Sequence, residues 1–132
     1  MSLKVQQFDH IGLNVTDLEK SIAFYQELLG FNIIEKWDVP RQAFIGNGNA
    51  VLGLMETANY DYSVYTLAHI AFPCHQSDFA GIVAKIKNLK LDIVSGPKAQ
   101  RGGETILFRD PSGNILEICY PSIQNRQYQP AS

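Results

Sequence analysis

The sequence is poor in the features that mark secreted and membrane proteins. It has only two cysteines among 132 residues, and Cys74 and Cys119 are neither close in sequence nor arranged as C-x-x-C. A disulfide framework is therefore not expected. No apolar run reaches the roughly 20 residues that a membrane-spanning helix requires, and the N-terminal residues lack the long apolar core of a signal peptide. These absences predict a cytoplasmic protein with no membrane partner.

Charge of one sign is equally scarce. Lysine and arginine together number 11, aspartate and glutamate number 13, the formal net charge is -2, and there is no basic run. We therefore expect no nucleic acid among the partners. With 45% hydrophobic and 18% charged residues, the composition is typical of a soluble globular protein. A chain of this length can form one domain with a real core, or two small similar halves packed together.

The first half of the chain predicts one strand, one helix and three further strands. Apolar and polar residues alternate over residues 8–15, which is the pattern of a half-buried strand. The next residues, TDLE, form a capping-box pattern with Thr16 as the predicted N-cap. The helix that follows has one apolar stripe and ends at Gly30, a residue suited to a helix C-cap. The three expected strands cover residues 32–37, 41–45 and 50–55.

The second half repeats this order. Residues 67–74, LAHIAFPC, place His69 where the first half has His10, and a helix with Ser77 as its predicted N-cap follows. A strand at residues 91–94, a loop at 95–103 and a hairpin come next. The inward-facing positions of the second helix are expected to be Phe79, Val83, Ile86 and Leu89.

Recurrence of this order over about 60 residues indicates an internal duplication. The predicted organisation is a single domain over residues 1–132, with a first module at about 5–57, a linker at about 58–65, a second module at about 66–121 and a tail at 122–132. The tyrosine-rich part of the linker is interpreted as either a lid or a dimer contact.

The predicted hairpin, FRDPSGNILEICY, contains a carboxylate in an apolar strand. Its turn has the residue types of a tight turn, because proline presets φ and glycine accepts a positive φ. Alternation places Glu117 on one face of the return strand together with Ile115 and Cys119. A carboxylate in such surroundings needs a cation, a hydrogen-bond donor or water.

The repeat supplies possible partners for this carboxylate. Taken alone, a strand histidine is usually a satisfied half-buried side chain, and Glu117 could be an edge charge facing water. However, His10 and His69 occupy the same place in the two halves, and all three side chains lie opposite the helix-facing side of their strands. Two imidazoles and one carboxylate can bind Fe, Mn, Zn, Ni or Co with coordination positions left for substrate. If the sheets of the two halves combine around a shared cavity, His10, His69 and Glu117 all point into it and would form a site for one divalent metal ion.

Three motifs, FDHIGLNVTDLEKSIAFYQELLGF, LAHIAFPC and FRDPSGNILEICYP, resemble those of the vicinal oxygen chelate superfamily. Its members include glyoxalase I, bleomycin-resistance proteins, extradiol dioxygenases and fosfomycin-resistance thiol transferases. The resemblance spans about residues 8–121 and implies an α+β fold, in which two βαβββ modules form an open barrel-like curved sheet with the helices outside. It also implies that the metal chelates neighbouring substrate oxygens, that the ligands are His10, His69 and Glu117, and that the protein is a homodimer.

The chain departs from lyases of the glyoxalase I type at their fourth ligand. Matching the last strands of the two modules places Gly53 where a glutamate would be expected. Glu56 is the only nearby carboxylate, and its odd offset from Gly53 places it on the opposite face unless a bulge intervenes. Glu56 is therefore kept as a possible fourth ligand, with a solvated strand end as the alternative.

The chain also departs from the other branches. Arg126 follows Glu117 at the spacing found in fosfomycin-resistance enzymes, but Gly12 replaces their hydroxyl-bearing residue. Their phosphonate-binding cluster is not reproduced, and only Lys98, Arg101 and Thr105 could partly substitute for it. Leu107 stands where an extradiol dioxygenase would have a tyrosine, and His75 lies in a predicted loop.

These comparisons leave the reaction open. Gly12 and Gly53 either make room for a larger substrate or mark local bulges. The expected function is a metal-dependent enzyme acting on a small oxygen-rich molecule, as a lyase or isomerase, by thiol or water addition, or as a dioxygenase. The alternatives are a drug-sequestering protein of the bleomycin-resistance type and a vestigial metal site. The remaining candidates for the substrate pocket are Trp37, Phe44, Met55, Thr105, Leu107, Cys119 and Arg126.

Overall fold

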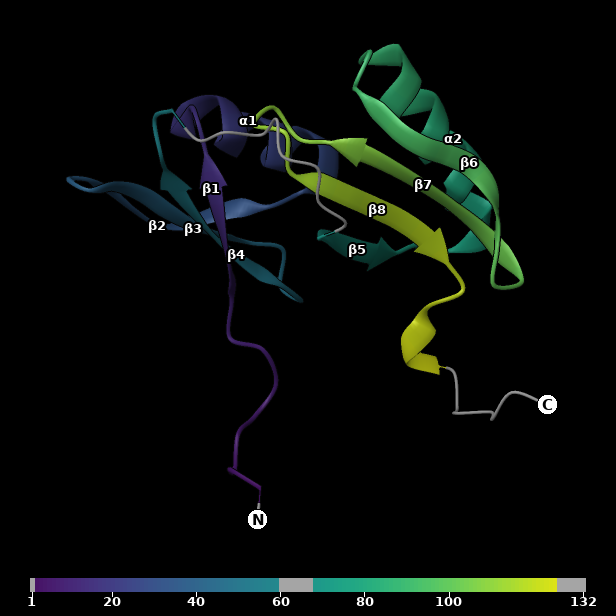
Figure 1. Cartoon of the computed structure of the whole chain (residues 1–132), viewed down its shortest axis with the longest axis horizontal. Coiled ribbons are helices and arrows are strands. Elements are labelled where there is room, and N and C mark those ends of the chain that lie inside the picture. The colour runs from purple at the N-terminus through teal and green to yellow at the C-terminus, as the bar shows by residue number, and fades with distance from the viewer. Residues whose placement is uncertain (1, 60–67, 126–132) are drawn as a thin grey trace. The chain divides into compact units, whose positions relative to one another are not determined.

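The computed structural model describes residues 2–59 and 68–125, which fall into two compact units, Met1–Tyr65 and Thr66–Ser132. Each unit contains a strand, a helix and three further strands, in that order (Figure 1). The predicted α+β fold of two βαβββ modules is therefore confirmed. In the described part of the chain neither helix is long and apolar enough to cross a membrane. Most of the predicted linker and Arg126 lie outside the described residues.

The first unit has a four-stranded sheet in the order β1-β4-β3-β2. Its first strand runs parallel to its last, and the other neighbours are antiparallel. The elements are β1 (Ile11–Val15), α1 (Leu18–Leu29), β2 (Asn32–Asp38), β3 (Arg41–Gly46) and β4 (Val51–Glu56).

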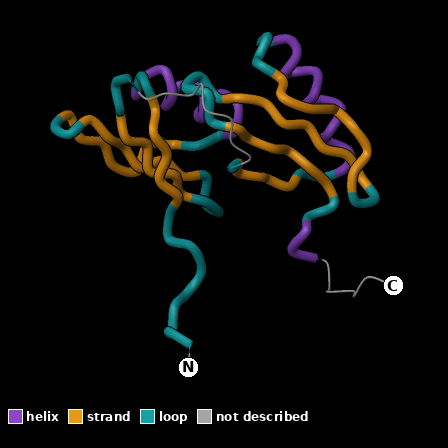
Figure 2. Tube along the Cα trace, viewed as in Figure 1, coloured by secondary structure: helices purple, strands orange, loops and turns teal. Residues whose placement is uncertain are grey.

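The second unit has the same topology, with the strand order β5-β8-β7-β6. Again the first strand runs parallel to the last and lies beside it in the sheet. Figure 2 shows the strands in orange and the helices in purple. The elements are β5 (His69–Pro73), α2 (Gln76–Asn88), β6 (Ile93–Gln100), β7 (Gly103–Arg109), β8 (Ile115–Tyr120) and a 3-10 helix (Ile123–Asn125).

Each helix lies against one face of the sheet of its own unit. Successive strand residues point to opposite faces, so the apolar residues under the helix leave every second position for the other face. In β4, Leu52 and Leu54 are buried on the helix side, and Gly53 between them faces the other way. The remaining buried apolar residues include Val15, Leu18, Ile22, Tyr25 and Ile45 of the first unit and Phe79, Ile86, Ile106, Phe108, Leu116 and Ile118 of the second.

The predicted N-caps of both helices differ from those in the structure. In α1 the N-cap is Asp17, not Thr16, because the Asp17 carboxylate accepts a hydrogen bond from the Lys20 amide at 3.1 Å. Gly30 caps the other end with φ at 70°, as predicted. The second helix begins after His75, whose side chain makes no capping hydrogen bond, so the prediction of Ser77 as N-cap is wrong.

The loop predicted at residues 95–103 is largely strand β6. Its pairing with β7 shifts register on either side of Ser95, and these irregularities let the strand include a glycine and a proline that suggest a loop in the sequence. A two-residue turn then joins β6 to β7, with φ at 48° for Arg101 and 79° for Gly102. Positive φ at both central residues is the geometry of a type I′ hairpin turn, which matches strand twist.

Two further elements are shorter than predicted. The first strand does not cover all of residues 8–15, and Leu89 does not belong to the buried face of α2. Strand pairing begins only at Ile11, so His10 immediately precedes β1. Leu89 is 42% exposed because the helix ends at Asn88 and Leu89 is its C-cap.

Candidate functional site

Two of the three predicted ligands lie together in the second unit. His69 begins β5 and Glu117 lies in the middle of the adjacent parallel strand β8. The distance from His69 Nε2 to Glu117 Oε1 is 3.2 Å. The Glu117 side chain is only 6% exposed, whereas that of His69 is 39% exposed. A buried carboxylate thus has an imidazole at one of its oxygens, where both can donate electron pairs to a cation.

The other oxygen of Glu117 has different neighbours. The hydroxyl of Thr105, a fully buried residue of β7, donates a hydrogen bond of 2.5 Å to Oε2. The Nη2 atom of Arg101, from the β6–β7 turn, lies 3.6 Å from the same oxygen. Glu117 is therefore compensated by a hydroxyl and a guanidinium in addition to the imidazole, as a buried carboxylate requires.

Further residues of β7 and β8 share the sheet face with this carboxylate. Leu107 of β7 is the cross-strand partner of Glu117, and Thr105 is the partner of Cys119. Burial raises the pKa of the Cys119 thiol, and the negative charge of Glu117 raises it further. The predicted pocket residues Thr105, Leu107 and Cys119 thus share the face of the sheet that bears Glu117.

In the first unit, His10 lies against an aromatic pair. Its ring meets that of Phe44 edge-on with the centroids 4.9 Å apart, and Phe44 in turn meets Trp37 at 5.7 Å. The His10 Nδ1 atom is 2.7 Å from an Asp9 carboxylate oxygen. The His10 side chain remains 42% exposed. Contacts at Nδ1 and at one ring edge orient this imidazole.

The glycines of this unit make room for protein side chains. Gly12 and Gly53 are cross-strand partners, and strand pairing is regular through both, so neither marks a bulge. A Cβ on Gly53 would lie 2.9 Å from Phe44 Cε1 and 3.5 Å from His10 Cδ2. A Cβ on Gly12 would lie 3.2 Å from the terminal carbon of Met55. Phe44 therefore takes the space that a side chain at position 53 would need.

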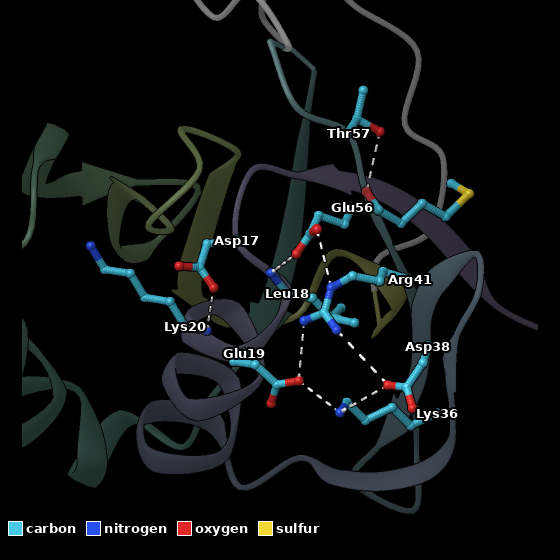
Figure 3. A network of polar contacts seen from close by, with 10 residues as sticks. Asp17, Leu18, Glu19, Lys20, Lys36, Asp38, Arg41, Glu56 and Thr57 are labelled. Carbon is cyan, nitrogen blue, oxygen red and sulfur yellow. Dashed lines mark hydrogen bonds and ion pairs between the residues drawn. The ribbon is translucent and has the colours of Figure 1, made fainter.

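Glu56, the candidate fourth ligand, points to the helix side of the sheet (Figure 3). Its Oε2 atom accepts a hydrogen bond from the Leu18 amide at 2.9 Å, and its Oε1 atom accepts one from Arg41 Nε at 3.1 Å. The Leu18 hydrogen bond is the first cause that lowers the pKa of Glu56, and Arg41 lowers it further. The structure thus places Glu56 at the N-terminus of α1, on the side of β4 opposite to Gly53.

The model of the Glyoxalase/Bleomycin resistance protein/Dioxygenase superfamily matches residues 7–118. The chain belongs to this superfamily. The resemblance to vicinal oxygen chelate proteins is thereby confirmed.

Proteins similar to this chain include two transferases. The chain is 31% identical to the metallothiol transferase FosB of Lysinibacillus sphaericus, over 94% of this chain and 89% of that protein. It is 30% identical to the glutathione transferase FosA of Serratia marcescens, over 92% of this chain and 86% of that protein.

A solved structure supports the fold. A mutant of the fosfomycin resistance protein FosX of Listeria monocytogenes, complexed with Mn(II) and 1S,2S-dihydroxypropylphosphonic acid, aligns with a TM-score of 0.80 at 23% identity. The alignment covers 92% of this chain and 96% of that chain. The alignment shows that the present chain has the arrangement of strands and helices found in FosX.

Sequence reasoning missed some of the contacts around the predicted ligands. The positions of Thr105 and Arg101 beside Glu117 follow from the register of the β7–β8 hairpin and from the tight β6–β7 turn. Gly102 was a usable turn signal, since glycine accepts the positive φ of the second position in a two-residue turn between strands. Apart from the adjacency of the two residues, nothing in the sequence indicated the contact between Asp9 and His10.

Proposed function

We propose that this chain is a divalent-metal-dependent enzyme that adds a nucleophile, either a thiol or water, to a small oxygen-rich organic substrate. The observation that carries the proposal is the pairing of His69 Nε2 with Oε1 of the buried Glu117 at 3.2 Å. The relatives named as metallothiol and glutathione transferases support thiol addition. The diol bound by FosX supports water addition, because a vicinal diol is what water gives on opening an epoxide.

The proposed ligands are His10, His69 and Glu117. An imidazole beside a carboxylate suits Mn, Fe, Co, Ni or Zn, so the donor types fit a divalent ion of this group. Within residues 2–59 and 68–125, no three histidine, cysteine, aspartate or glutamate side chains group as a metal site. His69 and Glu117 of the second unit supply two of the three proposed donors, and His10 of the first unit is the third.

The bound ion would supply Lewis-acid stabilisation of the charge that develops on a substrate oxygen. The residues of the chain hold and orient the reactants. The ring pair of Phe44 and Trp37 offers an apolar surface beside His10, and Leu107 lies opposite Glu117. In the addition, a bond forms between the sulfur or oxygen of the nucleophile and a substrate carbon, a carbon–oxygen bond breaks, and the nucleophile's proton ends on the released oxygen.

Two features favour addition over the other reactions of the superfamily. A lyase of the glyoxalase I type would need a carboxylate at position 53, where the chain has a glycine covered by Phe44. An extradiol dioxygenase would need a proton-transferring side chain at Leu107, which has none. Neither feature hinders the opening of an epoxide by a thiol or water.

The proposal is tested with metal-free protein reloaded with Mn(II) and supplied with fosfomycin or other small epoxides. Glutathione, cysteine or water alone serves as the nucleophile, and products are followed by NMR. We expect metal-dependent consumption of an epoxide that is lost in Glu117→Ala and retained in Glu35→Gln, a change at an exposed glutamate of β2. Binding without any turnover would contradict the proposal and would indicate a sequestering protein.

A further inference from the structure

The two oxygens of Glu117 have separate surroundings. Oε1 faces His69 Nε2 at 3.2 Å, whereas Oε2 receives the Thr105 hydroxyl at 2.5 Å. An ionised carboxylate can only accept hydrogen bonds, so the Thr105 hydroxyl is the donor. Hydrogen bonds of this charge-assisted kind are shorter and stronger than neutral ones. One oxygen is thus held by the sheet, and the other is directed toward the histidine.

Thr105 is suited to hold a side chain in place. It is fully buried on β7, whose pairing with β8 is regular from Glu104 to Arg109. It pairs with Cys119 and is therefore the diagonal neighbour of Glu117 on the same face of the sheet. A branched Cβ restricts the rotation of the threonine side chain. The hydroxyl is consequently presented from a rigid element.

Arg101 adds positive charge on the same side. Its Nη2 atom lies 3.6 Å from Oε2, and its side chain is 36% exposed. The distance exceeds that of a hydrogen bond, so its attraction is weaker and less directional than that of Thr105. Thr105 and Arg101 both contact Oε2 of Glu117, and Oε1 faces His69.

We propose that Thr105 is a positioning residue that fixes Glu117 through Oε2 and so presents Oε1, beside His69, to the metal. This inference rests on the proposed metal site and gives Thr105 a role other than contact with substrate. Outer-shell partners that orient a ligand typically change metal affinity by roughly 10–100-fold when they are removed.

The test compares a variant of Thr105 that lacks the hydroxyl with one that keeps it. Thr105→Val keeps the shape and removes the hydroxyl, and Thr105→Ser keeps the hydroxyl. Mn(II) and Zn(II) affinities are measured by competition with a chromogenic chelator, on protein whose folding is checked by circular dichroism. We expect Thr105→Val to lose about 10–100-fold in affinity and Thr105→Ser to stay near the wild type. Thr105→Ala, which also lacks the hydroxyl, replaces the valine variant if that variant does not fold.

A second readout separates positioning from a purely structural role. If Thr105 only supports the sheet, Thr105→Val lowers the Tm of the metal-free and metal-loaded proteins equally. If it positions Glu117, the rise in Tm caused by Mn(II) becomes smaller. Ile106→Val, on the same strand but facing α2, should lower both Tm values and leave metal affinity unchanged.

Failure of the role proposed for Thr105 and failure of the proposed metal site would give different results. Wild-type affinity in Thr105→Val, or equal losses in the valine and serine variants, would overturn the role of Thr105 while the metal site stands. Failure of the wild type to bind either ion would instead overturn the proposed function, and the inference with it.

Discussion

At the residue scale, Gly53 shows how a change of one side chain removes a possible ligand. The residue lies directly across from Phe44 in the β3–β4 pairing, and the Phe44 ring covers its backbone. An aromatic ring over a cross-strand glycine is a known way to compensate for the missing side chain. The same ring meets His10 edge-on, so the glycine also allows the contact that orients the histidine.

Gly53→Ala should therefore destabilise the protein. The new Cβ would stand 2.9 Å from Phe44 Cε1, and moving the ring should cost about 1–3 kcal/mol. Urea unfolding measures the change. The control is Gly81→Ala in α2, where a Cβ would meet nothing within 4 Å, and this variant should gain about 0.5–1 kcal/mol. A neutral or stabilising Gly53→Ala would show that the ring does not need this space.

Alternation along the strands was enough to predict the sides on which Gly53, Glu56 and Glu117 lie. It could not predict which atoms would meet them. The hydrogen bond from Thr105 depends on the register of a hairpin whose connection, residues 110–114, is shaped by hydrogen bonds to the Asp110 carboxylate from the Ser112 and Asn114 amides. Such side-chain contacts within a turn set a register that residue types alone leave open.

At the element scale, Glu56 joins the end of β4 to the start of α1. Its carboxylate accepts from the Leu18 amide and from Arg41 of β3, and Arg41 also lies 3.3 Å from Glu19 Oε1 (Figure 3). The Glu56 hydrogen bond raises the pKa of Arg41, and that from Lys36 lowers the pKa of Glu19. Strand, hairpin and helix are thus linked through charged side chains.

This link predicts a pH-dependent contribution to stability. Because the pKa of Glu56 is lowered in the folded protein, its carboxylate stabilises the fold above the ordinary glutamate pKa of about 4.3, and this contribution is lost as the pH falls through the lower folded value. Glu56→Gln should therefore be less stable than the wild type at pH 7, with a difference that shrinks below about pH 4.

Urea unfolding between pH 3 and pH 7 measures this difference. Glu35→Gln, at an exposed site on β2, controls for the loss of one negative charge and should show a smaller change at pH 7. A Glu56→Gln effect that is constant over the whole pH range would contradict the role given to the charge.

The elements themselves were largely predictable, and their ends were not. The strands of the first unit and the C-cap at Gly30 follow from hydrophobic pattern and glycine placement. The N-cap of α1 lies one residue after the predicted Thr16, because Asp17 is equally suited to the capping role. The part of β6 after residue 94 was predicted as a loop because glycine and proline suggest a loop in the sequence, whereas register shifts accommodate them.

At the scale of the whole molecule, the duplication was visible in the sequence because each module repeats the same order with a histidine at the same place. The structure gives the two units the same sheet order. The proposed metal site divides its donors between them, with His10 from the first and His69 and Glu117 from the second. We propose that these three side chains bind one ion.

The most direct test is the metal content and affinity of the wild type and of His10→Ala, His69→Ala and Glu117→Ala, by elemental mass spectrometry and chelator competition. His75→Ala is the control, because His75 is the remaining histidine of the chain and precedes α2. We predict one divalent ion per chain, retained in His75→Ala and weakened in the other three by more than the roughly 10–100-fold that outer-shell changes cause. A wild type without metal, or a His10→Ala variant that binds metal as tightly as the wild type, would contradict the proposed three-ligand site.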